Sequence, residues 1–169
     1  SNTILGKRAG EGSIDGLKNN ASYNVIIGNE SGMNIDSGEN NILIGSKTIN
    51  RNDAAGWSIT SGSDNIAIGN QSGKSMTSAE NNILVGKGTG SSITTSGYNI
   101  IIGKDSGSSL TSEEGNNIMI GSCTGVNVTK GNNLLIGNEA GKLNSSSEVI
   151  CIGNQSGYYN SGDRNTFIG

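Results

Sequence analysis

The chain has 169 residues and a formal charge of −3, with 28 Gly, 25 Asn, 25 Ser, no Pro and no His. Without His it lacks the commonest general base and zinc ligand, and without a basic cluster it lacks the charge that binds nucleic acid. We therefore expect no nucleic-acid partner. No apolar run is long enough to cross a membrane, so we also expect no membrane insertion by this segment.

The sequence repeats along its whole length. An aliphatic residue followed by Gly recurs ten times, mostly at spacings of 16 to 18 residues, with two longer spacings of 22 and 24. Short repeats that each hold one strong β segment predict a solenoid, in which each coil buries its core only against its neighbours. The marker glycines that define the repeats are Gly6, Gly28, Gly45, Gly69, Gly86, Gly103, Gly121, Gly137, Gly153 and Gly169.

Each repeat predicts a short strand that ends at the marker glycine, and tight corners at this glycine and at a second Gly four residues later. We expect the residues three and one before the marker to face the coil interior. A second apolar position lies six or seven residues after the marker, at Ile35, Met76, Ile93, Leu110, Val128, Leu143 and Tyr159.

An Asn stands four residues before the marker in nine of the ten copies, with Val149 as the exception. Asn at one fixed corner predicts a ladder in which the side-chain amides of successive coils bond to one another. The expected ladder contains Asn24, Asn41, Asn65, Asn82, Asn99, Asn117, Asn133 and Asn165.

The residue two before the marker would then point outward, yet it is apolar in every copy. An outward apolar stripe along the rod needs a cover, and a closed cyclic oligomer, most simply a homotrimer, would bury it in every chain. The alternative is a flattened coil with both strand faces inside. The candidate oligomer seam consists of Ile26, Leu43, Ala67, Leu84, Ile101, Met119, Leu135, Cys151 and Phe167, with Ile4 at its start.

Two repeats contain extra residues, within 11–23 and 49–64, and insertions in solenoids map to loops that carry recognition. The second insertion holds the only tryptophan, Trp57, near Arg51, Asn52 and Asp53. An indole with polar neighbours suits stacking on a sugar ring or docking on a protein partner, so these four residues form a candidate ligand-binding loop. Alternatively, Trp57 covers an apolar patch under its own loop or seals a subunit interface.

The stretch D-N-I-A-I-G-N-Q-S over 64–72 resembles the head repeats of YadA-like trimeric autotransporter adhesins. The N-T-F-I-G ending at Gly169 and the I-G-N-E-A-G ending at Gly141 resemble the TFIG-type repeats of phage and other viral fibre proteins. This resemblance covers nearly the whole chain. It implies a left-handed parallel β-roll that is homotrimeric, lies outside the cell on a bacterial surface or virion fibre, and attaches to something.

Together these patterns predict an all-β fold, a parallel β-solenoid of the left-handed β-roll type with about nine coils of 16 to 18 residues. Residues 1–169 would form one repetitive segment of a longer fibre. We expect a structural fibre or adhesin segment that meets a host-surface glycan or protein, with no catalytic residues, no metal and no cofactor. The alternatives are an ice-binding solenoid, which needs a flat exposed rank of Thr, and a glycan-active solenoid enzyme.

Overall fold

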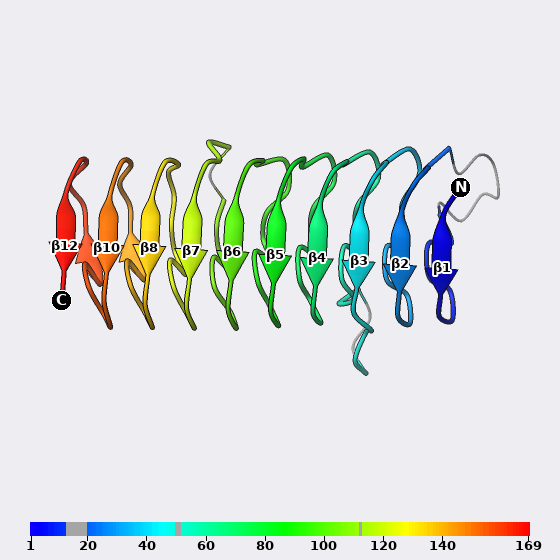
Figure 1. Cartoon of the computed structure of the whole chain (residues 1–169), viewed down its shortest axis with the longest axis horizontal. Coiled ribbons are helices and arrows are strands. Elements are labelled where there is room, and N and C mark those ends of the chain that lie inside the picture. The colour runs from blue at the N-terminus through cyan, green and yellow to red at the C-terminus, as the bar shows by residue number, and fades with distance from the viewer. Residues whose placement is uncertain (13–19, 50–51, 112) are drawn as a thin grey trace.

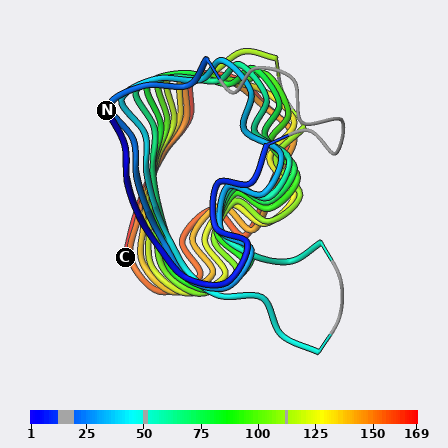
Figure 2. The same cartoon turned by 90° about the vertical axis from the view of Figure 1, so that its right-hand side faces the viewer.

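The computed structural model describes residues 1–12, 20–49, 52–111 and 113–169. Within these residues the chain is all-β with no helix, and its parallel strands stack into a solenoid (Figure 1). The predicted fold class is therefore confirmed. Figure 2 looks along the stack and shows that successive coils superpose, apart from a few excursions at the rim.

A ten-stranded parallel sheet runs the length of the rod, and each of its strands ends directly before a marker glycine. Each strand pairs only with the strands of the adjacent coils, without any shift of register. The strands are β1 (Thr3–Leu5), β2 (Val25–Ile27), β3 (Ile42–Ile44), β4 (Ile66–Ile68), β5 (Ile83–Val85), β6 (Ile100–Ile102), β7 (Ile118–Ile120), β8 (Leu134–Ile136), β10 (Ile150–Ile152) and β12 (Thr166–Ile168). A second, two-stranded sheet pairs β9 (Leu143–Asn144) with β11 (Tyr159–Asn160).

The marker glycines make the corner that each strand turns into. Gly28 has φ 124° and Gly32, four residues later, has φ 54°, both in the region that residues with a side chain rarely adopt. A Cβ atom on Gly28 would lie 2.7 Å from the carbonyl oxygen of Gly45 in the next coil. The marker position therefore requires glycine for its backbone angle and for the close stacking of coils.

The predicted direction of the strand faces is wrong. The residues two before the marker lie inside the coil and form an inner column that packs against the second apolar position of each coil. The members assigned to an outward seam are buried: Ile26, Leu43, Ala67, Leu84, Ile101, Met119, Leu135 and Cys151 are at most 1% exposed, and Phe167 is partly buried against the same core.

The reason lies in the alternation of a strand. The ladder Asn, four before the marker, is buried inside the coil, and residues two apart on a strand share a face. The residue two before the marker must therefore also face inward, and those three and one before it must face outward. Three consecutive aliphatic residues, such as Ile83, Leu84 and Val85, show no alternation of their own that could reveal this.

The Asn residues stack as a ladder through most of the rod. Asn99 donates its backbone N–H and its Nδ2 to Oδ1 of Asn82, at 3.1 and 3.0 Å, and its own Oδ1 accepts the same two bonds from Asn117. The same pattern links the ladder from Asn2 to Asn133. Each ladder carboxamide is thus both donor and acceptor within the core.

Near the C-terminal end the amides change sides of the coil. Val149 occupies the ladder position, and Asn133 Oδ1 accepts instead from Nδ2 of Asn144, 3.2 Å away, and from the Val149 N–H. Asn144 fills the second inner position, where the earlier coils have an aliphatic residue, and Asn160 continues this substitute ladder.

The residues predicted for the second inner position in these two coils were Leu143 and Tyr159. Leu143 is half-buried and Tyr159 is 78% exposed, because Asn144 and Asn160 take the interior place. Asn165 is also off the predicted ladder, since its Nδ2 donates to Asn160 Oδ1 rather than to a residue at the Val149 position.

Candidate functional site

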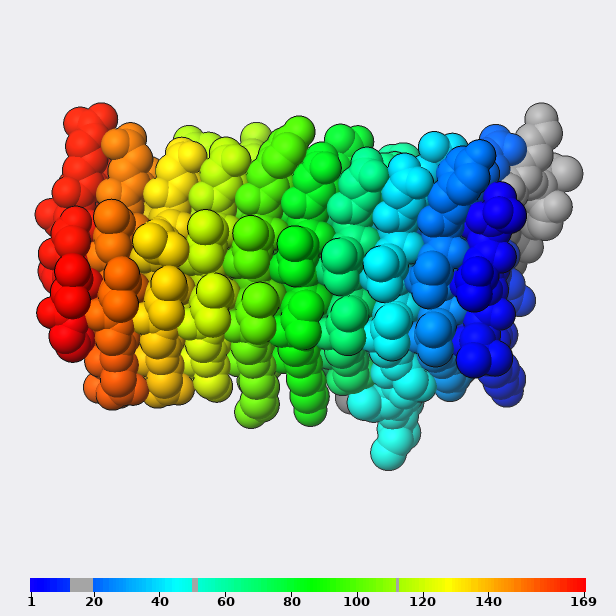
Figure 3. Space-filling model, in the orientation of Figure 1, coloured from blue at the N-terminus to red at the C-terminus, as the bar shows by residue number. Residues whose placement is uncertain are grey.

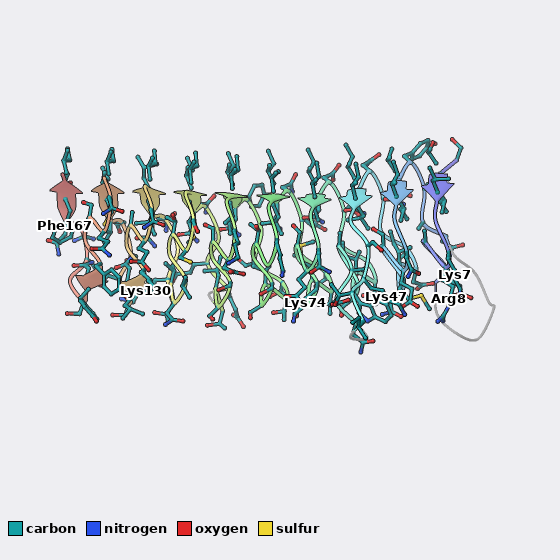
Figure 4. The ribbon with its side chains drawn as sticks, turned by 90° about the horizontal axis from the view of Figure 1, so that it is seen from below. Lys7, Arg8, Lys47, Lys74, Lys130 and Phe167 are labelled. Atoms are coloured by element: carbon teal, nitrogen blue, oxygen red, sulfur yellow. The ribbon has the colours of Figure 1, made fainter. Side chains whose placement is uncertain are left out.

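The first candidate is the outward side of the ten-stranded sheet, which we call the outer face. It consists of the residues three and one before each marker glycine, and Figure 4 shows side chains that stand out from the strands on the side away from the rest of the coil. Eight strands, β2 to β8 and β10, each contribute two aliphatic side chains: Val25, Ile27, Ile42, Ile44, Ile66, Ile68, Ile83, Val85, Ile100, Ile102, Ile118, Ile120, Leu134, Ile136, Ile150 and Ile152.

The outer face is uncharged over its whole length and is apolar from β2 to β10, with Thr3 and Thr166 in the two end strands. Ile100, Ile102, Ile118 and Ile120 are each 36 to 38% exposed, and none of the ten strands contains a charged residue. Figure 3 shows side chains of this side aligned in rows from coil to coil. With strands about 4.8 Å apart, the rows extend for roughly 43 Å.

A shallow hollow adjoins the outer face where the ladder is interrupted. Its volume is about 380 Å³, and Val149 lies in it together with the flanking outer-face residues Ile118, Leu134 and Ile150. The hollow gives the otherwise regular face a recess into which a side chain from another surface could pack.

The second candidate is the insertion after Gly45. The chain follows the regular path as far as Lys47, whose N–H donates to the Asn29 carbonyl of the coil before it. The regular path resumes at Asp53, whose carbonyl accepts from the N–H of Gln71 in the coil after it. Thr48, Ile49 and Asn52 therefore lie off the regular path, and we call these three residues the protruding segment; Figure 2 shows the chain leaving the rim there.

Asp53 closes the base of the protruding segment. Its Oδ1 accepts from the Thr48 N–H at 2.9 Å and its Oδ2 accepts from the Thr48 hydroxyl. Burial raises the pKa of Asp53, but hydrogen bonds from Thr48, Gln71 and Asn70 favour the charged form and lower the pKa overall. Asp53 is 3% exposed and its carboxylate closes the loop, so it is the least accessible of the described residues predicted for the ligand-binding loop.

Trp57 does not lie in the protruding segment. It follows Gly56, the second corner glycine of its coil, at the position that Met33 occupies in the coil before and Lys74 in the coil after. The Trp57 carbonyl accepts two bonds from Asn34, from the N–H at 3.3 Å and from Nδ2 at 3.0 Å. Arg51, the fourth residue of the predicted loop site, lies outside the described residues.

A pocket of about 290 Å³ lies between the protruding segment and the coils beside it. It combines two apolar side chains, two carboxamides and three charged groups. Trp57 and Asn52 were predicted from the sequence, whereas Lys47 of the same coil and the lining residues from earlier coils were missed. The pocket is lined by Arg8, Glu30, Met33, Asn34, Lys47, Asn52 and Trp57.

The charged groups of the pocket occupy one repeat position, two residues after the marker glycines of three successive coils. Glu30 contacts both Arg8 and Lys47, the two cations that are labelled in Figure 4. Its Oε1 is 2.5 Å from Lys47 Nζ and 3.5 Å from Arg8 Nη1, and its side chain is 5% exposed. The alternation of Arg, Glu and Lys at one column is the sequence signal that would have identified this cluster.

The residues that the structure describes contain no group of three or more His, Cys, Asp or Glu side chains placed to hold a metal ion. They also contain no helix whose length and apolarity would suit a membrane span. Cys123 and Cys151 are both free, and burial raises the pKa of the Cys151 thiol.

Comparison of the chain with models of protein families, with curated proteins and with solved structures found no match.

Proposed function

We propose that this chain is a segment of a trimeric fibre or adhesin, a rigid rod that serves attachment to a host cell or another surface and performs no catalysis. One observation carries the proposal: the outer face is a long aliphatic surface on a parallel sheet. Parallel sheets occur almost only with both faces covered, and the solenoid covers only the inner one. A second copy of the chain provides a cover with the same length and spacing.

The shape of the outer face favours a cyclic trimer. It presents two aliphatic rows, which are the residues three and one before the markers. In a cyclic arrangement around an axis parallel to the rod, each chain has two neighbours, and each neighbour can meet one row. With a length of roughly 43 Å and a width of about 10 Å, the outer face covers about 430 Å². This area lies in the range of the largest apolar patches of monomeric proteins, and its shape is a continuous stripe.

This arrangement replaces the seam that the sequence predicts with a different set of residues. The homotrimer remains the expected partner state, but the contacts are made by the outer face instead of the inner column. Attachment to a host-surface glycan or protein, outside a bacterial cell or on a virion, is supported by the resemblance to adhesin and viral fibre repeats. A stiff, hydrogen-bonded rod suits the task of holding a binding surface away from its anchor.

Light scattering on the purified chain at micromolar concentration tests the proposal. We expect three times the mass of one chain. The double variant Ile102→Glu/Ile120→Glu places charges on the outer face and should give monomers that keep their β circular dichroism. The matched control Ser78→Glu/Thr95→Glu adds the same charges at exposed positions outside the ten-stranded sheet and should remain trimeric.

A wild-type chain that is monomeric at these concentrations would overturn the trimer. A variant that stays trimeric with charges at Ile102 and Ile120 would exclude the outer face as the contact. A dimer would keep the outer face as an interface but contradict the threefold arrangement.

Ice binding is a second candidate, favoured by one exposed rank of threonines that the sequence analysis did not identify. Thr60 and Thr77 each donate their hydroxyl to the carbonyl of the next Thr in the rank, at 3.2 Å. The threonines form a single rank, and the hydroxyls of Thr60 and Thr77 already donate hydrogen bonds within it. The rank therefore resembles an ice-binding surface less than two parallel ranks would. A thermal-hysteresis measurement decides this point. The exposed rank consists of Thr60, Thr77, Thr94, Thr111 and Thr129.

A further inference from the structure

We propose that the pocket beside the protruding segment binds one neutral sugar residue. The inference rests on the proposed attachment function and names the class of ligand that the rod would meet. It is carried by three features of the pocket: an apolar platform, a buried carboxylate with a free oxygen, and a balance of charge.

The platform is formed by Trp57 and Met33, which occupy the same repeat position in adjacent coils. Met33 is 4% exposed, whereas Trp57 is half-buried and lines the pocket. An indole that is partly open to solvent offers a flat apolar surface with a large contact area. The C–H face of a pyranose ring can pack against such a surface.

The carboxylate is Glu30, whose side chain is 95% buried and lines the same pocket. Both cations contact Oε1, and Oε2 accepts no hydrogen bond from the residues that the structure describes. Oε2 is open to solvent at the pocket surface, where a ligand hydroxyl can donate to it. Holding Oε1 on Lys47 and Arg8 keeps Oε2 in place for this bond.

The charges of the pocket balance and therefore favour a neutral ligand. Lys47 and Arg8 are matched by Glu30 and by Glu11, whose Oε2 lies 2.5 Å from Arg8 Nε. An anionic ligand would need an unpaired cation, and a cationic ligand would need an unpaired carboxylate, and the cluster provides neither. Polar groups in balance beside an apolar platform suit a molecule with many hydroxyls and no charge.

Two carboxamides complete the set of polar groups. Nδ2 of Asn34 donates to the Trp57 carbonyl, which holds this side chain beside the indole. Asn52 lies on the protruding segment, and its carboxamide makes no hydrogen bond to other described residues. A volume of about 290 Å³ is at the lower end for small-molecule pockets, which fits one sugar ring and not a longer chain.

The same repeat position without an insertion provides a matched control. Tyr158 follows Gly157 just as Trp57 follows Gly56, and its ring is packed under Lys142, whose Nζ lies 5.5 Å from the ring centroid. The Tyr158 coil has the regular length, so an aromatic residue at this position does not by itself create the pocket.

Because Trp57 is the only tryptophan, its fluorescence reports on this pocket alone. The wild-type chain is titrated with methyl glycosides of neutral hexoses, 6-deoxyhexoses and N-acetylhexosamines, and with methyl sialoside and choline as charged probes. We expect a saturable change with at least one neutral sugar, at a dissociation constant on the order of 1 mM, and none with the charged probes.

Variants are measured by saturation-transfer NMR on the sugar, which does not need the tryptophan. Trp57→Ala should abolish the signal and Glu30→Gln should weaken binding about tenfold. Asn52→Ala removes an exposed side chain without hydrogen bonds, so it should fold normally and weaken binding several-fold. Tyr158→Ala should bind like the wild type.

The inference is overturned if no neutral sugar changes the fluorescence up to about 50 mM, if only a charged probe does, or if Asn52→Ala and Tyr158→Ala bind equally. These outcomes are separate from those of the proposed function. A trimeric chain that binds no sugar would contradict only the proposed sugar site. A monomeric chain that binds a sugar through Trp57 would contradict only the proposed trimer.

Discussion

Asp53 shows how a single carboxylate joins an irregular segment to a regular rod. Its two oxygens bond the N–H and the hydroxyl of Thr48, while its backbone carbonyl serves the stack by accepting from Gln71. The side chain of Asp53 thus ties the end of the loop to its start at Thr48, and the adjacent coils retain their spacing. The sequence predicted this carboxylate as part of a ligand-binding loop because it stands near Trp57 within an insertion.

Loss of this carboxylate should make stability depend less on pH. The pKa of Asp53 is lowered in the folded chain, so its contribution is present above the unfolded pKa of about 3.9 and disappears as the pH falls through the folded value. We expect Asp53→Asn to be less stable than the wild type by about 1 to 2 kcal/mol at pH 7, and the difference to shrink as the pH falls below about 3.9. Urea unfolding at several pH values measures this.

The control for this experiment is Asp64→Asn. Asp64 is exposed, and its side chain makes no hydrogen bond or ion pair to other described residues, so its replacement should leave the pH dependence of unfolding unchanged. A deficit in Asp53→Asn that is as large at pH 3 as at pH 7 would show that the charge of Asp53 is not what closes the loop.

At the scale of the strand, sequence reasoning located every element of the main sheet but reversed its faces. The marker glycine defines where each strand ends, and the observed φ of residues such as Gly28 agrees with the predicted corner. The choice of face failed because strands such as β6 are aliphatic on both sides. Such runs are typical of parallel strands that are buried on both faces. In the single chain, only the inner face of the sheet is covered.

The pocket shows a different limit of the sequence. Trp57 and Asn52 are separated by four positions and attract notice together, whereas Arg8 and Glu30 join them only because coils stack. Finding such neighbours requires a comparison of the repeats column by column, two residues after each marker. The exchange of Asn and Val at the end of the ladder was missed because it couples two separate positions of the repeat, one four before a marker and one seven after the preceding marker.

This exchange can be transplanted to another coil. Val149 at the ladder position is compensated by Asn144 at the second inner position, which donates to Asn133. Ile93 and Asn99 occupy the corresponding positions in an earlier coil, where Ile93 is 1% and Asn99 0% exposed. We expect Ile93→Asn and Asn99→Val to be destabilising singly, because each leaves buried polar groups without partners.

The double variant Ile93→Asn/Asn99→Val should recover part of the loss, with a favourable coupling of about 1 to 3 kcal/mol in a double-mutant cycle. Guanidinium unfolding of the four proteins measures the coupling. The pair Asn99→Val/Leu110→Ala combines the same ladder change with a core change in the following coil and should be closer to additive. Additivity in the first pair would mean that the exchange at Val149 is not compensatory.

At the scale of the whole molecule, each coil is bound only to its neighbours. Every strand of the main sheet pairs with the strand before and the strand after, and the ladder carboxamides follow the same order. The stability of such a rod is approximately a sum of terms for coils and for the interfaces between them. The outer face and the rod length thus follow from the number of repeats, whereas the pocket depends on one insertion.

Because coils are equivalent in the stack, removal of one complete repeat should preserve the fold. Deletion of residues 83–99 joins Asn82 to Ile100 and keeps every column in register. We expect cooperative unfolding with a denaturant m value about one tenth smaller, and a rod about 4.8 Å shorter by small-angle X-ray scattering. Deletion of residues 83–91 removes about half a repeat and moves polar residues into the inner column, so this control should not fold. If the first deletion also failed to fold, the coils would not be interchangeable, and the stability of the rod would depend on particular repeats and not on their stacking.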